Sequence, residues 1–220
     1  MGGISMDKRI ITQALTLALA DKGKRKFTQS VEFIVNFRNI DFTKAENRLN
    51  LDILLPKGKG KEQKVIVFAD GQMALEAKNA GATEVIDNSG IAKLAGDKGR
   101  LAAMVKTCEF IAQPSLMVTV GKSLGQVLGS RGKLPRPIIG SVKEAIEQSK
   151  RRVRLASKGK YLPVAQCLIG SEAMPIDDLA ENFDAAYEKV KTKALEVNIK
   201  SVYVKLSMGK PVKIGAKVAE

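Results

Sequence analysis

The sequence predicts an α/β protein with two domains. One is a discontinuous α+β domain, an antiparallel sheet packed with helices, which both termini form together; the other is an inserted Rossmann-like domain with a doubly wound parallel sheet. Both ends of the chain carry runs in which apolar and polar residues alternate, a pattern typical of strands with one buried face. The middle instead alternates short apolar runs with helical patterns, which indicates strands buried on both faces of a parallel sheet.

A segment rich in glycine and lysine, KGKGKEQK at residues 57–64, separates the first alternating runs from the middle pattern. It contains no apolar residue, so the sequence indicates a domain boundary there. We therefore expect residues 1–62 and 157–220 to form the discontinuous domain and residues 63–156 to form the inserted one.

The N-terminal part predicts one helix and two strands. Asp7 is a suitable helix cap, and it precedes apolar residues at helical spacing: Ile10, Ile11, Ala14, Leu15, Ala18 and Leu19. A basic stretch at residues 21–26, DKGKRK, ends this helix; it fits either a solvated loop or a set of phosphate contacts. Alternating runs at residues 27–39 and 49–55 then predict two strands, which we expect to pair antiparallel with each other.

The middle part predicts strands at residues 65–69, 83–86 and 108–112, with a helix over residues 73–80. The C-terminal part predicts strands at residues 152–156 and 160–170, a helix after Pro175, and a last strand at residues 201–206. In that last strand Val202, Val204 and Leu206 form a buried face, and the strand runs into a corner of Ser207, Met208 and Gly209. Gly209 there fits either a turn that needs a permissive backbone angle or a close approach to a partner.

Composition excludes several classes of function. The chain of 220 residues has 37 Lys and Arg against 23 Asp and Glu, a formal net charge of +14, so we expect anionic partners. It contains no histidine, which excludes imidazole catalysis and the commonest nitrogen ligand of zinc. Cys108 and Cys167 both precede apolar residues and are interpreted as core thiols rather than a disulfide or metal site. No apolar run is long enough to cross a bilayer, and we expect a cytoplasmic protein without a membrane partner.

Nucleotide-binding motifs are incomplete. Gly121, Lys122 and Ser123 match the end of a phosphate-binding loop, but Leu116 stands where its leading glycine belongs. No GxGxxG follows the strand at residues 65–69. We expect no cofactor, no metal and no catalytic residues, although a small enzyme that uses a nucleotide or phosphorylated metabolite in the middle domain stays as the alternative. The stretch LGSRGKLPRP at residues 128–137 fits either a turn or a nucleic-acid contact.

Three stretches together resemble the ribosomal protein L-one family, the stalk protein of the large ribosomal subunit, in its archaeal form. They are FTQSVEF at residues 27–33, LGSRGKLPRP at residues 128–137 and SVYVKLSMGKPVKI at residues 201–214, and PKGKGK at residues 56–61 resembles the family's domain connector. The resemblance implies a non-enzymatic protein that is monomeric when free and works in the cytoplasm on the ribosome. It also implies binding of stalk rRNA beside the tRNA exit site, assistance in the release of exit-site tRNA, and repression of the protein's own operon mRNA.

The resemblance also implies which residues bind RNA. Lys26, Phe27, Ser30 and Glu32 are expected to form one half of the site and Ser207, Met208 and Gly209 the other. Polar residues of these strands and of the strand at residues 160–170 complete the prediction: Asn36, Gln166, Ser201, Tyr203 and Lys205, with Arg131, Lys133 and Arg136 as a secondary RNA contact. The family usually has threonine at the position of Ser207 and commonly proline at that of Ser130.

The chemistry of these residues agrees with RNA binding. Double-stranded RNA presents a shallow minor groove lined with 2′-hydroxyls, which small hydroxyl side chains and bare backbone can approach. Ser30, Ser207 and Gly209 supply such groups, and Lys26, Lys205 and Lys210 add attraction to phosphates. Two residues each have two possible roles. Phe27 packs either on ribose or in the core, and Glu32 either forms a hydrogen bond with a sugar or base or pairs with a lysine.

Overall fold

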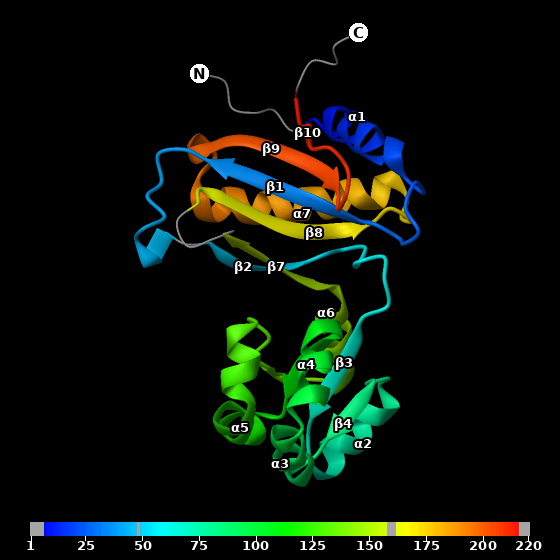
Figure 1. Cartoon of the computed structure of the whole chain (residues 1–220), viewed down its shortest axis with the longest axis vertical. Coiled ribbons are helices and arrows are strands. Elements are labelled where there is room, and N and C mark those ends of the chain that lie inside the picture. Colours follow the sequence, from blue (N-terminus) through cyan, green and yellow to red (C-terminus); the bar gives the residue numbers. More distant parts are fainter. Residues whose placement is uncertain (1–6, 48, 158–161, 216–220) are drawn as a thin grey trace. The chain divides into compact units, whose positions relative to one another are not determined.

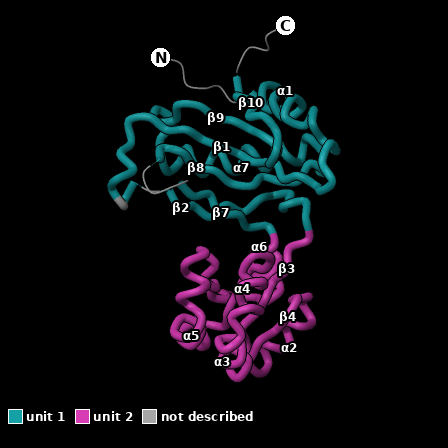
Figure 2. Tube along the Cα trace, in the orientation of Figure 1, with its two compact units in different colours: residues 1–61, 151–220 teal, residues 62–150 magenta. Residues whose placement is uncertain are grey.

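The computed structural model describes residues 7–47, 49–157 and 162–215. The chain divides into two compact units: residues 1–61 with 151–220, here the terminal unit, and residues 62–150, the middle unit (Figure 2). The return boundary therefore falls six residues earlier than the sequence predicts. The reason is strand pairing, because β7 (Arg152–Ser157) pairs with two strands of the terminal unit, β2 (Asn50–Leu54) and β8 (Val164–Ser171).

An antiparallel sheet of six strands forms the terminal unit, in the order β10-β9-β1-β8-β7-β2. Its remaining strands are β1 (Ser30–Phe37), β9 (Ile199–Leu206) and β10 (Val212–Lys213). The expected pairing of the two N-terminal strands is wrong, because β1 pairs with β8 and β9 whereas β2 pairs with β7. Every second residue of β1 is buried, which suits a strand with a neighbour on each side; β2 buries only Ile53 and lies at the edge.

Two helices, α1 (Lys8–Ala18) and α7 (Ile176–Ala194), pack with the apolar face of this sheet (Figure 1). Asp7 caps α1 as predicted, since its carboxylate accepts a hydrogen bond from the backbone N–H of Arg9 at 3.1 Å. Phe33 of β1 and Phe183 of α7 meet edge to face, with ring centroids 5.1 Å apart. Cys167 lies in the same core, and burial raises the pKa of its thiol to about 12. Cys108 is also buried and free, so both cysteines are core thiols as predicted.

The middle unit contains a parallel sheet in the order β4-β3-β5-β6. Its strands are β3 (Lys64–Phe68), β4 (Glu84–Ile86), β5 (Cys108–Ala112) and β6 (Arg136–Pro137). Its helices are α2 (Gly71–Asn79), α3 (Asn88–Gly96), α4 (Lys98–Thr107), α5 (Met117–Ser130) and α6 (Val142–Arg151).

Successive residues of β3 enter two separate cores, which confirms the predicted doubly wound sheet. Ile66 and Phe68 pack in one core with residues of α3, α4 and α5. Val65 and Val67 pack in another with residues of α2 and α6. The alternation of side chains along a strand therefore gives each face of the sheet its own layer of helices.

The structure shows the conformation of two sequence motifs of the middle unit. Gly121, Lys122 and Ser123 lie inside α5, where helix hydrogen bonds engage the backbone, so they form no phosphate-binding loop. The same helix continues to Ser130, so the expected loop at residues 128–137 is shorter and begins at Arg131. Within the described ranges, no helix is both long and apolar enough to cross a membrane.

Candidate nucleic-acid interface

The ends of three strands of the terminal unit meet at one place. β1 begins at Ser30, which pairs with Ser171 at the end of β8, and the next residue, Val31, pairs with Leu206 at the end of β9. This register brings together the two halves of the predicted RNA site, although Ser30 and Ser207 are 177 positions apart in the sequence. We call the surface formed by Lys26, Phe27, Ser30, Glu32, Ser207, Met208 and Gly209 the strand-end surface.

Hydrogen bonds to one carbonyl oxygen join the two halves. The backbone N–H of Ser207 donates to the carbonyl oxygen of Ser30 at 3.0 Å, and the hydroxyl of Ser207 donates to the same oxygen at 3.3 Å. Because the hydroxyl has a single proton, this bond leaves the lone pairs of Oγ available to accept from a ligand. The strand-end surface thus presents an acceptor at Ser207.

Two large apolar side chains of the strand-end surface are exposed. Phe27 is 54% exposed and Met208 is 60% exposed. The interpretation of Phe27 as a core residue is therefore wrong, because the turn before β1 holds it outside the sheet. Exposed aromatic and thioether groups can pack on the apolar faces of sugars and bases.

Glu32 pairs with a lysine, which is one of the two alternatives that the sequence leaves open. The ammonium of Lys205 lies 3.8 Å from the Glu32 carboxylate and donates to the carbonyl oxygen of Ser207 at 3.0 Å. Both side chains are about one quarter to one third exposed. The lysine offsets the repulsion that an isolated carboxylate would exert on a phosphate backbone.

The other predicted residues lie along the outer face of the same sheet. Tyr203 of β9 and Gln166 of β8 both stand opposite Ile34, and both are half-buried. The amide of Asn36 donates to the hydroxyl of Ser201 at 3.1 Å. Ser201 is only 6% exposed and lies six residues from Ser207, about 20 Å along the strand. The structure therefore places Asn36 and Ser201 far from the strand-end surface and engages them with each other.

The backbone angle at position 209 is one that any residue can adopt, so the interpretation of the corner as a turn that needs a permissive backbone angle is wrong. Its φ lies outside the left-handed region that favours glycine. A Cβ at this position would instead lie 3.1 Å from the Cβ of Leu206 and 3.4 Å from its backbone nitrogen. The turn is closed by a 2.9 Å bond from the Gly209 N–H to the Leu206 carbonyl oxygen. A side chain at position 209 would therefore be tight against Leu206, which would have to shift by a few tenths of an ångström.

A buried amide and carboxylate support the corner, and the sequence interpretation missed both. Gln29 is 2% exposed and Glu172 is 5% exposed. The Gln29 backbone and side-chain N–H groups donate to the two carboxylate oxygens of Glu172 at 3.0 and 3.3 Å, and its Oε1 accepts from the N–H of Met208 at 3.1 Å. Gln29 stands two residues before Val31 and four before Phe33, so the alternation places it on the buried face of the strand. A polar residue at such a position needs hydrogen-bond partners, and this signal could have revealed its role.

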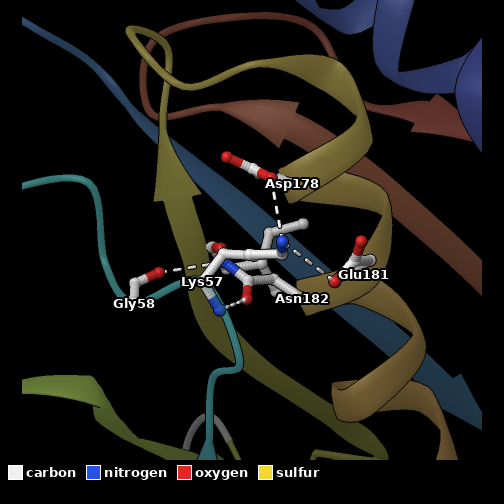
Figure 3. A network of polar contacts seen from close by, with 6 residues as sticks. Lys57, Gly58, Asp178, Glu181 and Asn182 are labelled. Carbon is white, nitrogen blue, oxygen red and sulfur yellow. Dashed lines mark hydrogen bonds and ion pairs between the residues drawn. The ribbon is translucent and has the colours of Figure 1, made fainter.

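Polar bonds fix the first part of the connector to the terminal unit (Figure 3). Asn182 of α7 is fully buried; its Oδ1 accepts from the N–H of Lys57 at 3.0 Å, and its Nδ2 donates to the carbonyl oxygens of Gly58 and Ile169 at 2.9 and 2.8 Å. The Lys57 ammonium lies 3.5 Å from the Glu181 carboxylate and 3.6 Å from that of Asp178. Both negative charges raise the pKa of Lys57, and Glu181 has the larger effect. The start of the connector, Lys57 and Gly58, is therefore held in place by polar contacts although it contains no apolar residue.

The predicted secondary contact lies in the middle unit. Lys133 pairs with Glu109 of β5 at 2.5 Å, and its N–H donates to the Leu128 carbonyl oxygen at 2.8 Å. Arg131 is exposed just after α5, and Arg136 is the first residue of β6. The loop therefore presents Arg131 openly, whereas Glu109 partly neutralises Lys133.

The chain matches the profile of the family described as Ribosomal protein L1p/L10e family over residues 18–210. It is 44% identical over 199 residues to the large ribosomal subunit protein uL1 of Thermofilum pendens, which covers 89% of this chain and 88% of that protein. It is 39% identical over 214 residues to the uL1 of Methanocella arvoryzae, which covers 95% of this chain and all of that protein. Identity to the uL1 of Methanocaldococcus jannaschii is 36% over 220 residues, or 98% of this chain and 99% of that protein.

Proposed function

The chain belongs to the Ribosomal protein L1p/L10e family of large-subunit, rRNA-binding proteins, and we propose that its strand-end surface binds the rRNA of the mobile stalk beside the tRNA exit site. Members of this family are structural constituents of the ribosome rather than enzymes. Large-subunit rRNA is thus the partner of this chain, and the ribosome is its place of action.

The observation that carries the proposal is the junction of Ser30 and Ser207. It places a hydroxyl acceptor and the backbone of Gly209 at one corner, next to the exposed side chain of Met208. A ribose 2′-hydroxyl can donate to the Ser207 oxygen, and the shallow minor groove of RNA lets a backbone turn approach this closely. Lys26 and Lys210 are exposed, Lys210 directly after Gly209, and both supply attraction to phosphates.

We further propose that the same surface binds a stalk-like element in the mRNA of the protein's own operon and so represses its translation. One surface with a fixed pattern of donors and acceptors selects RNA by local shape, so two RNAs with the same local structure compete for it. Each free protein molecule, as a monomer, would then hold either the rRNA or the mRNA.

The middle unit is proposed to act on exit-site tRNA. The loop with Arg131, Lys133 and Arg136 offers cationic side chains suited to phosphate contacts, which position a nucleic acid without reading its sequence. Such contacts would assist release of deacylated tRNA when the stalk moves. The alternative of a nucleotide-dependent enzyme has no support from the Gly-Lys-Ser stretch, because it is helical.

Competition binding tests the proposal. Labelled stalk rRNA should bind the purified protein, and unlabelled operon leader mRNA should displace it, whereas a duplex RNA of equal length should not. Failure of the leader mRNA to displace the rRNA would remove the repressor role, and failure of the rRNA itself to bind would remove the whole proposal. Turnover of added nucleotides by the purified protein would favour the enzyme instead.

A further inference from the structure

We propose that Lys61, the last connector residue of the terminal unit, is an additional RNA-contact residue of the strand-end surface. The proposal rests on the proposed rRNA binding and assigns a cationic contact to a residue outside both halves of that surface. Lys61 is exposed, and its ammonium donates to the hydroxyl of Ser30 at 3.2 Å and to the carbonyl oxygen of Thr28 at 2.9 Å.

The path of the connector holds Lys61 at this position. Asn182 fixes Lys57 and Gly58, as described above, and the side chain of Lys59 is buried. Gly60 has a left-handed φ of +65°, and a Cβ there would lie 2.5 Å from the side chain of Met174 and 3.0 Å from that of Ser171. The backbone before Lys61 therefore lies against the terminal unit, so no backbone has to be ordered there when RNA binds.

The contacts of Lys61 determine what it offers to RNA. An ammonium has three N–H donors, and the bonds to Ser30 and Thr28 use two of them. The third donor and the positive charge remain for a phosphate oxygen. In addition, the Ser30 hydroxyl accepts from Lys61, so its own proton is free to donate to the RNA.

The two serines therefore present opposite hydrogen-bonding groups. Ser207 uses its proton within the protein and presents an acceptor, whereas Ser30 accepts from Lys61 and presents a donor. A ribose 2′-hydroxyl donates as well as accepts, and a neighbouring phosphate only accepts. We infer that Lys61 sets this order of groups and contacts the phosphate next to the ribose that Ser207 recognises.

Equilibrium binding of stalk rRNA to the full-length protein over a series of KCl concentrations tests the proposal. Loss of one phosphate contact should weaken binding by about tenfold near 0.1 M salt and should reduce the slope of log affinity against log salt by about 0.7 to 0.9. Lys61→Met should show both effects. Lys189→Met removes the same charge from an exposed position on α7, away from the sheet, and should match the parent.

Two more variants separate charge from hydrogen bonding. Lys61→Arg keeps a cation and should bind within about threefold of the parent, with the parent's salt slope. Lys61→Gln keeps N–H donors, on a side chain one bond shorter, but loses the charge, so it should resemble Lys61→Met. Because Lys61→Gln keeps a polar side chain with N–H donors at this position, it also gives the effect of charge if Lys61→Met proves less stable in thermal melting.

Two results for Lys61→Gln would overturn the inference. Weaker binding by Lys61→Gln with an unchanged salt slope would make Lys61 an anchor of the connector and not an RNA contact. Parent-like binding by Lys61→Gln would show that RNA does not use the charge. Failure of the parent itself to bind stalk rRNA would instead contradict the proposed function, so the two failures are distinguishable.

Discussion

Asn182 should be the main anchor of the connector, and its replacement by alanine should destabilise the terminal unit. The fully buried amide makes three hydrogen bonds, to Lys57, Gly58 and Ile169, at 2.8–3.0 Å. A net contribution of about 1 kcal/mol per bond gives a loss of about 3 kcal/mol from the free energy of unfolding. For a unit of this size that loss corresponds to a fall of about 10 °C in Tm.

Differential scanning calorimetry measures this effect, with Lys57→Met as the matched control. The control removes the ion pairs to Asp178 and Glu181, but the three side chains are 33–47% exposed, and exposed pairs contribute little to stability. The order of the two effects is therefore the test. A larger destabilisation by Lys57→Met than by Asn182→Ala would refute the reasoning, because charge and not the buried amide would then hold the segment.

Further predictions concern the corner and the core. Gly209→Val should strongly weaken rRNA binding, because a branched side chain tight against Leu206 would shift the corner; parent-like binding by the folded variant would make the corner an ordinary turn. Ser207→Ala should lose about 1 kcal/mol of binding free energy and Ser207→Thr almost none, and equal losses in a titration would argue against a role for the hydroxyl. Gln29→Ala should weaken rRNA binding by releasing the N–H of Met208, and unchanged affinity would show that the corner needs no such support. Burial raises the pKa of the Cys167 thiol above its unfolded value of 9.0, so the stability that the buried neutral thiol contributes is complete below pH 9 and is lost as pH rises toward 12. Cys167→Ala should therefore flatten the Tm–pH curve between these values. Identical curves for the variant and the parent would show that Cys167 does not cause the fall in Tm.

Alternation along the chain was enough to predict the faces of the strands but not their neighbours. The pattern in β1 correctly puts Val31, Phe33 and Val35 in the core, yet the same pattern is compatible with any adjacent strand. Pairing depends on tertiary contacts, and here β1 lies between two C-terminal strands. The predicted doubly wound sheet depended only on strand–helix repetition, and the structure confirms it.

The strand-end surface shows a similar division. Resemblance to a family indicated Ser30 and Ser207, and the structure brings them together. Gln29 and Asn182 were missed because a buried polar side chain acts through partners that are distant in sequence, such as Glu172 and Gly58. Lys61 was interpreted as part of a connector, because its contact with Ser30 depends on the folded path of the segment before it.

The most direct test of the central claim is to separate the two units and measure rRNA binding. A chain in which a short Gly-Ser linker replaces residues 62–150 keeps the six-stranded sheet, including β7, and with it the strand-end surface. Its affinity for stalk rRNA should stay within about tenfold of the parent, and residues 62–150 alone should bind at least a hundredfold more weakly, a difference of about 2.7 kcal/mol. Loss of more than a hundredfold by the folded terminal unit, or parent-like binding by the middle unit, would contradict the assignment of rRNA binding to the strand-end surface.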